Sequence, residues 1–188
     1  MNSISFKATH IDNVNIRTLN EYGEYVDRKA AFVKRNPYSQ LDYNSIIDIG
    51  HLWSDAKPNY VFSMLHHSDI IKDGEKREVY FLTEQENNYR KIIPDKVLGM
   101  IEITKHKNYD KINYIQTNPD NMFTNTTRKN KGIGWAMLTM ADKLSHGKDI
   151  ILFARKTMTE FYKKYGFVIS YDNCINPKMV LRRTNIYK

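Results

Sequence analysis

The chain has 188 residues, 41% hydrophobic and 12% aromatic, an apolar content that excludes a disordered protein and suffices for a single domain over residues 1–188. Its one cysteine, Cys174, excludes an internal disulfide, and no apolar run approaches the roughly 18 residues of a membrane span. The net charge is +8 and no basic-then-apolar leader opens the sequence, so we expect a soluble, cytoplasmic protein that meets an anionic partner.

Apolar spacing predicts strands and helices in the first part of the chain. Apolar and polar residues alternate over Ser3–Thr9, which is a strand pattern. Apolar residues recur every three or four positions over Leu19–Val33, with Asn20 as a candidate N-cap, and again over Asn44–Trp53, which predicts two helices. Asn59–Leu65 is expected to be extended.

A run of strands follows. Glu78–Thr83, Val97–Thr104 and Ile112–Thr117 are apolar and rich in β-branched or aromatic residues, so each predicts a strand. Ser68–Arg77 and Asn118–Thr127 are rich in charged or turn-forming residues and are expected to be a turn and an exposed loop.

A basic Gly-x-Gly stretch at Arg128–Gly134 runs directly into the apolar stripe of a helix that we expect to end at Gly147. Glycines let the backbone come close to a ligand, and a helix start adds unpaired N–H donors and partial positive charge. An anion such as a pyrophosphate is therefore expected here, although a plain turn before a surface helix has the same pattern.

The charge distribution agrees with an anionic partner for this part of the chain. Residues 96–188 hold 17 of the 29 lysines and arginines but only 7 of the 21 acidic residues. A phosphorylated cofactor, nucleic acid, an acidic protein or a simple solvated surface would each account for this excess.

The remaining sequence predicts a strand, a short helix and two further strands. The capping-box spacing of Thr157 and Glu160 marks the start of that helix, and Gly166 marks its end. The elements expected, in order, are a strand at Asp149–Ala154, a helix at Met158–Tyr165, and strands at Phe167–Ser170 and Lys178–Leu181. The pattern predicts an α+β or α/β fold with a mostly antiparallel sheet.

Two segments together resemble the GNAT superfamily of acyl-CoA N-acyltransferases. Members carry (Arg/Gln)-x-x-Gly-x-(Gly/Ala) at a helix start, which Lys129-Asn-Lys-Gly-Ile-Gly134 resembles, and later Phe-Tyr-x-x-x-Gly-Phe, which matches Phe161–Phe167. The resemblance is specific over Val97–Leu181 and only general over residues 1–95. It implies an α+β fold with a mixed, mostly antiparallel sheet, a splayed strand pair and helices on both faces.

Three departures from the family pattern bear on individual contacts. Lys129 replaces the usual Arg or Gln at the head of the loop, and several extra residues separate Pro119 from it. Arg155 stands where members often have an asparagine.

The resemblance implies acetyl-CoA, or another acyl-CoA, as the cofactor of residues 96–188, with the acceptor side built by residues 1–95. Backbone N–H groups of the loop would hold the pyrophosphate, the side chains of Lys129 and Lys131 would add charge, and the pantetheine would pair like a strand. The candidate cofactor-binding residues are Ile115, Gln116, Thr117, Lys129, Asn130, Lys131, Gly132, Ile133, Gly134 and Arg155.

The family reaction is direct attack of an amine on the thioester, so Cys174 needs no role. Tyr162 matches the family's tyrosine at the thiolate and is the candidate general acid, or else it simply packs. Glu102 is the only carboxylate in its strand and is the candidate general base, facing either the cleft or solvent, with bulk water as the alternative. His66-His67 lacks metal-ligand partners, so no metal is expected.

The predicted function is an N-acetyltransferase acting on a primary amine of a small molecule, peptide or protein, as a monomer or homodimer. The alternative is a basic nucleic-acid-associated protein, which could acetylate aminoacyl-tRNA, or an inactive CoA-binding member. Trp53, Tyr60, Tyr22 and Tyr25 could line an acceptor pocket or pack in the core, and no motif identifies the acceptor.

Overall fold

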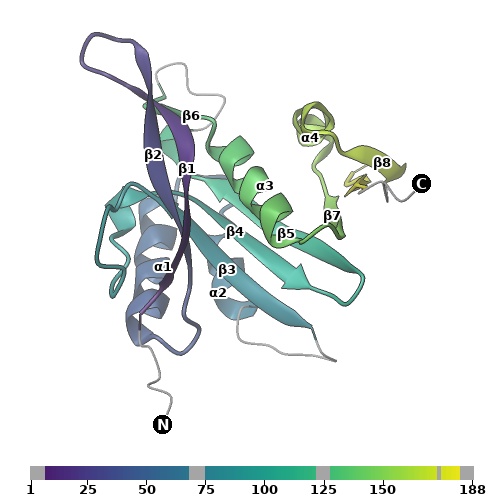
Figure 1. The fold of residues 1–188 in the computed structure, drawn as a ribbon, viewed down its shortest axis with the longest axis horizontal. Coiled ribbons are helices and arrows are strands. Elements are labelled where there is room, and N and C mark those ends of the chain that lie inside the picture. The colour runs from purple at the N-terminus through teal and green to yellow at the C-terminus, as the bar shows by residue number, and fades with distance from the viewer. Residues whose placement is uncertain (1–6, 68–74, 122–127, 173–174, 183–188) are drawn as a thin grey trace.

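The computed structural model describes residues 7–67, 75–121, 128–172 and 175–182 (Figure 1). The strands are β1 (Thr9–Leu19), β2 (Tyr25–Lys34), β3 (Lys76–Thr83), β4 (Val97–Lys105), β5 (Tyr109–Thr117), β6 (Asn130–Lys131), β7 (Asp149–Phe153), β8 (Val168–Tyr171) and β9 (Lys178–Leu181). The helices are α1 (Gln40–Leu52), α2 (Val61–His67), α3 (Ile133–Leu144) and α4 (Thr159–Tyr165), with short 3-10 turns at Pro94–Lys96, Pro119–Asn121 and Lys156–Met158.

The strands form one sheet in the order β6-β1-β2-β3-β4-β5-β7-β9-β8. Every neighbouring pair is antiparallel except β5 and β7, which run parallel and are connected through α3. Helix α3 covers one face of the sheet, while α1 and α2 cover the other (Figure 1). This confirms the predicted α+β architecture, a mixed and mostly antiparallel sheet with helices on both faces.

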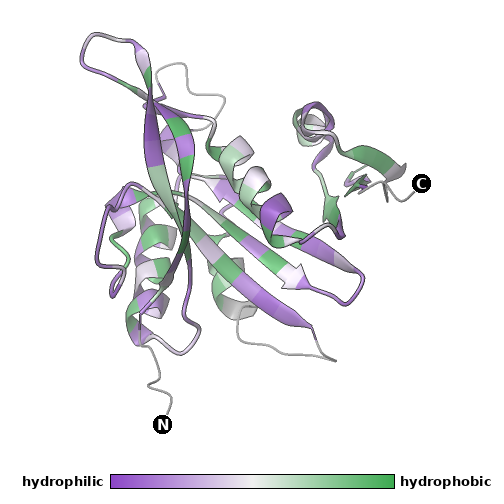
Figure 2. Cartoon of the chain, in the orientation of Figure 1, coloured by the Kyte–Doolittle hydropathy of each residue, from purple (hydrophilic) through white to green (hydrophobic). Residues whose placement is uncertain are grey.

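Alternate residues of the central strands supply two separate cores. On the α3 face, Tyr80 and Ile101 are buried in one cluster with Met137. On the opposite face, Phe81 and Met100 are buried in a second cluster with the apolar sides of α1 and α2. Figure 2 shows the resulting apolar bands along the central strands, whereas the outer part of the β1–β2 hairpin is mostly hydrophilic.

The helix predicted over Leu19–Val33 is wrong, because β1 and β2 form a hairpin there. Asn20 is a turn residue: its Oδ1 accepts hydrogen bonds from the N–H groups of Tyr22 and Glu24 at 3.0 and 2.8 Å. The apolar residues of this segment do not share one buried face, since Tyr22 is 80% exposed while Ala30–Val33 are buried consecutively. A helical period without a shared buried face does not make a helix.

Two further local predictions are wrong. The segment Asn59–Leu65, which we predict to be extended, contains most of α2. The side-chain oxygen of Asn59 accepts a hydrogen bond from the N–H of Val61, the first residue of this helix, at 3.1 Å. Thr157 does not cap α4, since this helix begins at Thr159 after a 3-10 turn and its N-cap, Met158, makes no side-chain cap hydrogen bond. At α2 a local side-chain hydrogen bond, rather than residue spacing, marks where the helix starts.

The other predicted helices and strands correspond to elements of the structure. Helix α1 extends the predicted Asn44–Trp53 towards the N-terminus because the side chain of Ser39 caps it, accepting from the N–H of Asp42 at 3.2 Å. The predicted strands of the second part are β3, β4, β5, β7, β8 and β9. Helix α3 begins where predicted and ends at Leu144, before Gly147.

Some predictions lie wholly or partly outside the described residues. Most of Ser3–Thr9, most of Ser68–Arg77, the second half of Asn118–Thr127 and all of Cys174 belong to this group. Within the residues that are described, no helix is long and apolar enough to cross a membrane.

Candidate active site

Strands β5 and β7 run side by side at one end only. Their parallel pairing covers Tyr109–Ile112 on β5 and Asp149–Leu152 on β7. Beyond it β5 continues through Asn113–Thr117 and is paired, within the described residues, with β4 alone. The free edge of this segment can pair with an extended ligand. It contains three of the predicted cofactor-binding residues, Ile115, Gln116 and Thr117.

The Gly-x-Gly loop leads into α3 without a side-chain cap. Gly132 is the N-cap residue at φ +81°, a left-handed conformation that glycine adopts without strain. The first helical hydrogen bond runs from the N–H of Ala136 to the carbonyl of Gly132, at 2.8 Å. The N–H groups of Ile133, Gly134 and Trp135 therefore have no acceptor within the helix, and an anion is favoured at this positive end.

Gly134 lets the two predicted motifs pack against each other. A Cβ atom built on Gly134 would lie 3.1 Å from Cζ of Phe161, so α4 can approach α3 this closely because a side chain is missing. The neighbouring Ile133 is 2% exposed and packs in the core on the α3 face. The Gly-x-Gly pattern thus serves helix packing as well as the helix start.

Asn130 ties the loop to the sheet. The short strand β6 pairs Asn130 and Lys131 with Thr18 and Arg17 of β1. Oδ1 of Asn130 accepts a hydrogen bond from Oγ1 of Thr18 at 2.8 Å, and its backbone N–H donates to Oδ1 of Asn121 at 2.7 Å. Because the N–H of Asn130 already donates to Asn121, the backbone donors that remain for an anion lie mainly at the start of α3.

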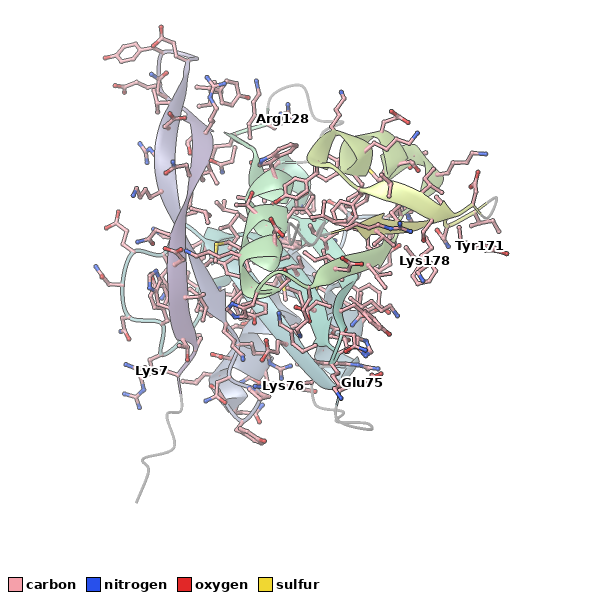
Figure 3. All side chains as sticks on the ribbon, turned by 45° about the vertical axis from the view of Figure 1, so that its right-hand side comes forward. Lys7, Glu75, Lys76, Arg128, Tyr171 and Lys178 are labelled. Carbon is pink, nitrogen blue, oxygen red and sulfur yellow. The ribbon has the colours of Figure 1, made fainter. Side chains whose placement is uncertain are left out.

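The basic side chains of the loop differ in their surroundings. Nζ of Lys131 lies 3.5 Å from the centre of the Tyr25 ring on β2, and the Tyr25 hydroxyl donates to the carbonyl of Arg128 at 2.6 Å. Lys129 is exposed, and its carbonyl accepts from the N–H of Leu19 at 2.8 Å. Arg128 lies where the β1–β2 hairpin meets the start of α3 (Figure 3). The hairpin therefore holds the loop in place.

Tyr162 lies on α4 and is only 6% exposed. Its ring meets those of Phe161 and Phe167 edge-on, with centres 5.2 and 5.8 Å away. Burial raises the pKa of the Tyr162 phenol to about 12, and the nearby Tyr60 adds to the rise. The phenol therefore keeps its proton at neutral pH, as a general acid must.

Tyr60, just before α2, contacts residues on both sides of the point where β5 and β7 separate (the strand divergence). Its N–H donates to Oε1 of Gln116 at 2.6 Å, and its ring centre lies 5.3 Å from that of Tyr114 on β5. The guanidinium carbon of Arg155, from the segment after β7, lies 5.7 Å from the centre of the Tyr60 ring. Arg155, predicted among the cofactor contacts, thus reaches a residue of the acceptor side.

Glu102 faces a cavity of about 280 Å³ that Arg77 and Lys111 also line. Its carboxylate is almost fully buried, and Nδ2 of Asn113 donates to its Oε1 at 2.7 Å and to Oγ1 of Thr104 at 2.6 Å. Glu102 lies on the α1–α2 face of the sheet, because it is two residues from Met100 of that core and stands between Ile101 and Ile103, which face the α3 side. Glu102 therefore contributes to the wall of this cavity from a nearly buried position.

Solved structures share this architecture, although no protein-family model and no curated protein matches the sequence. Tetrahymena GCN5 is 14% identical, with a TM-score of 0.53 over 79% of this chain and 92% of that one. An acyl-CoA N-acyltransferase from Pseudomonas aeruginosa is 10% identical, with a TM-score of 0.54 over 82% and 99% of the two chains. A protein assigned to the GNAT family, from Desulfovibrio desulfuricans, is 14% identical, with a TM-score of 0.53 over 80% and 96%.

The protein has the GNAT superfamily fold. The splayed strand pair expected of this fold is β5 and β7, and the start of α3 lies beyond the far end of β5. Of the aromatics predicted to line an acceptor pocket, only Tyr60 lies at the divergence. Trp53 is buried in the α1–α2 core, Tyr22 is at the tip of the hairpin, and Tyr25 contacts the loop.

Three polar residues of the candidate site, Arg77, Lys111 and Asn113, were missed by sequence reasoning. Arg77 falls at the end of the predicted turn Ser68–Arg77, and Lys111 and Asn113 alternate with apolar residues as in any strand with one polar face, so the sequence carries no signal that marks them. Asn113 marks a β-bulge, because the register between β4 and β5 skips it. Among the described residues, no three His, Cys, Asp or Glu side chains gather closely enough to hold a metal ion.

Proposed function

We propose that the protein is an N-acetyltransferase that moves the acetyl group of acetyl-CoA to a primary amine in a ternary complex. Its main support is the combination of three features around β5: a free strand edge, a helix start without a side-chain cap, and a buried, protonated tyrosine. Together they suit the pantetheine, the pyrophosphate and the leaving sulfur of one cofactor.

The pyrophosphate suits the start of α3. Three backbone N–H groups and the positive end of the helix dipole favour an anion there without any particular side chain. Exposed Lys129 adds one cation, and Lys131, stacked on Tyr25, adds a second in a fixed position. The pantetheine amides would pair with the free edge of Asn113–Thr117 as an added strand.

In the proposed reaction the amine nitrogen attacks the carbonyl carbon of the thioester. A C–N bond forms, the C–S bond breaks, and the CoA thiolate receives the proton of the Tyr162 phenol. The resulting phenolate takes a proton back from solvent. A phenol with a pKa of about 12 is a weak acid, so its role is to hold a proton against the sulfur as charge develops there.

The acceptor nitrogen gives up two protons in all. One goes to solvent as the amide forms, and the other must leave before the attack, because a primary ammonium group with a pKa of about 10.4 is mostly protonated at neutral pH. We propose Glu102 as the group that accepts this proton, directly or through a water molecule in the cavity. Asn113 keeps the carboxylate in place by donating a hydrogen bond to it. The carboxylate then passes the proton to solvent.

Nucleic-acid binding alone has less support. In the basic second part, Lys105 and Lys148 both pair with Asp110, and Lys163 pairs with Glu160. Such pairs reduce the positive charge that is available to a phosphate backbone. The charge excess therefore does not require a nucleic acid.

Acetyl-CoA titration by calorimetry, followed by mass analysis of an amine panel, tests the proposal. We expect binding and an acetylated product, and we expect Tyr162→Phe to lower kcat by about 100-fold with little change in the acetyl-CoA KM. Tyr165→Phe is the matched control, because that hydroxyl lies on the same helix and bonds only weakly, at 3.4 Å, to Thr139. No binding at millimolar acetyl-CoA would sink the proposal.

A further inference from the structure

The cavity beside Glu102 opens where β5 and β7 part. Ile112 is the last β5 residue paired with β7, and the cavity wall includes Ile112, Asn113 and, at the end of β7, Phe153. Its volume of about 280 Å³ is just below the roughly 300–1,000 Å³ that is typical of small-molecule sites. The space therefore suits a small acceptor placed next to a thioester in the strand divergence.

Two cationic residues lie in one row across three strands of this wall. Arg77 on β3 and Lys111 on β5 are both paired with Thr104 of β4, so the three side chains share one face. Neighbouring strands are about 4.8 Å apart, which puts the two backbone positions about 10 Å apart. Two long side chains at that spacing can converge on one anion.

Glu102 lies one row further along the same face. It is two residues from Thr104 on β4, a separation of about 7 Å. Nδ2 of Asn113 joins the two rows, since it donates both to Oε1 of Glu102 and to Oγ1 of Thr104. The cavity therefore presents a carboxylate and a pair of cations at the two ends of a short polar wall.

We propose that the acceptor is a small amine that carries its own anionic group, a carboxylate in the simplest case, only a few bonds from the nitrogen. This inference rests on the proposed acetyl transfer. The nitrogen lies against Glu102, and the anion lies between Arg77 and Lys111, where charge-assisted hydrogen bonds hold it. A polyamine or a lysine-rich segment would instead bring further positive charge to two cations in a small space.

Matched acceptors that differ by one carboxylate test the inference: tyrosine with tyramine, histidine with histamine, and ornithine with putrescine. The value of kcat/KM for acetylation is measured for each pair in the wild type, Arg77→Gln and Lys111→Gln. We expect the ratio of acid to amine to fall by about tenfold or more in each variant. Differences in intrinsic amine reactivity are common to all the proteins and cancel in this comparison.

Lys29→Gln is the matched control, because it removes one exposed cation from β2, outside the cavity, and should keep the wild-type ratio. Melting temperature and acetyl-CoA affinity are measured for every variant. Arg77 is half-buried, so Lys111→Gln provides an independent result if Arg77→Gln fails to fold.

An unchanged ratio in Lys111→Gln would overturn the inference, and so would acetylation of the decarboxylated amines alone. Failure of every acid to bind or react, in a protein that binds acetyl-CoA, would also overturn it. These results leave acetyl transfer in place. Absence of acetyl-CoA binding is the separate outcome that removes the proposed function itself.

Discussion

The two ends of the candidate site offer different kinds of chemical group to a ligand. At the proposed cofactor end, the groups available to a ligand are the backbone N–H donors of Ile133, Gly134 and Trp135 at the start of a helix. At the acceptor end, they are the side chains of Glu102, Arg77 and neighbouring residues on three strands. Backbone donors are present wherever the fold forms, whereas side-chain groups change with the residue at each position.

Under the proposed function, this difference would let the cofactor end tolerate extensive sequence change. The solved structures that share the fold are only 10–14% identical to this chain, and a helix start offers the same donors whatever side chains flank it. Lys129 can therefore replace the usual Arg or Gln without removing the backbone donors. The acceptor end can change its substrate by a few substitutions that leave the sheet intact.

The largest expected effect comes from placing a negative charge at the backbone-built end. Gly132→Asp should weaken acetyl-CoA binding by about 100-fold, because a carboxylate would compete with the pyrophosphate for the helix start. Asparagine has nearly the same shape as aspartate but no charge, and it also tolerates the left-handed conformation of residue 132. Gly132→Asn should therefore weaken acetyl-CoA binding only a few-fold. Calorimetric dissociation constants check this, and equal losses in both variants would mean that shape rather than charge decides.

A change at the side-chain-built end should have the opposite profile. Glu102→Gln keeps an oxygen that can accept from Asn113 but removes the proposed base, so kcat/KM for the acceptor should fall by about 10- to 100-fold. Acetyl-CoA affinity should stay at the wild-type value. Glu24→Gln, at the hairpin tip, is the control. A parallel loss of acetyl-CoA binding would contradict the separation of the two ends.

The buried phenol between them predicts a loss of stability at alkaline pH. The folded-state pKa of Tyr162, about 12, exceeds the value of about 10 for an unperturbed tyrosine. This contribution to the unfolding free energy is therefore complete below pH 10 and is lost as pH rises towards 12. By about pH 11 the wild type should have lost about 1 kcal/mol that Tyr162→Phe does not lose. Urea unfolding of both proteins near pH 9 and pH 11 measures the difference. Tyr80, whose pKa is also raised, is present in both proteins and so does not affect the difference between them. An equal loss of unfolding free energy in the two proteins between pH 9 and pH 11 would show that Tyr162 is not its source.

The smallest expected effect concerns the hairpin that supports the loop. Tyr25→Phe removes the hydrogen bond to the carbonyl of Arg128 and keeps the ring under Lys131, so acetyl-CoA should bind about two- to fivefold more weakly. Tyr22→Phe changes an 80% exposed tyrosine at the tip of the same hairpin and should have no effect. Identical affinities in the two variants would show that the hairpin does not position the loop.

Sequence reasoning succeeded where the signal is local. Gly132 and Gly134 start a helix, and Phe161–Phe167 end one, within a few residues of chain. The apolar run of β4 likewise needs no information about its partners, because nearly continuous burial makes it apolar along most of its length. The fold and the helix start at Gly132 could therefore be predicted from these segments, and the binding of a cofactor there stays a prediction.

It failed where the partner is distant in sequence. The hairpin residues Tyr22 and Val26 fit a helical spacing, and only the pairing of β1 with β2 makes them strand and turn. Arg77 and Lys111 are 34 positions apart in the sequence numbering and meet only because both pair with Thr104. Strand register decides such neighbours, and a single sequence does not specify it.

The support of the cofactor loop by the hairpin has a consequence for folding. The hydrogen bond from Thr18 to Asn130 joins residues 112 positions apart, and β6 depends on the same long-range pairing. Such contacts form late, since a large chain loop must close before they stabilise anything. During synthesis, the loop should therefore reach its final structure only after the β1–β2 hairpin and Asn130 have both left the ribosome. A fragment starting at residue 96 would carry the glycine motif without the hairpin that holds it, so we expect this fragment to bind the proposed cofactor poorly.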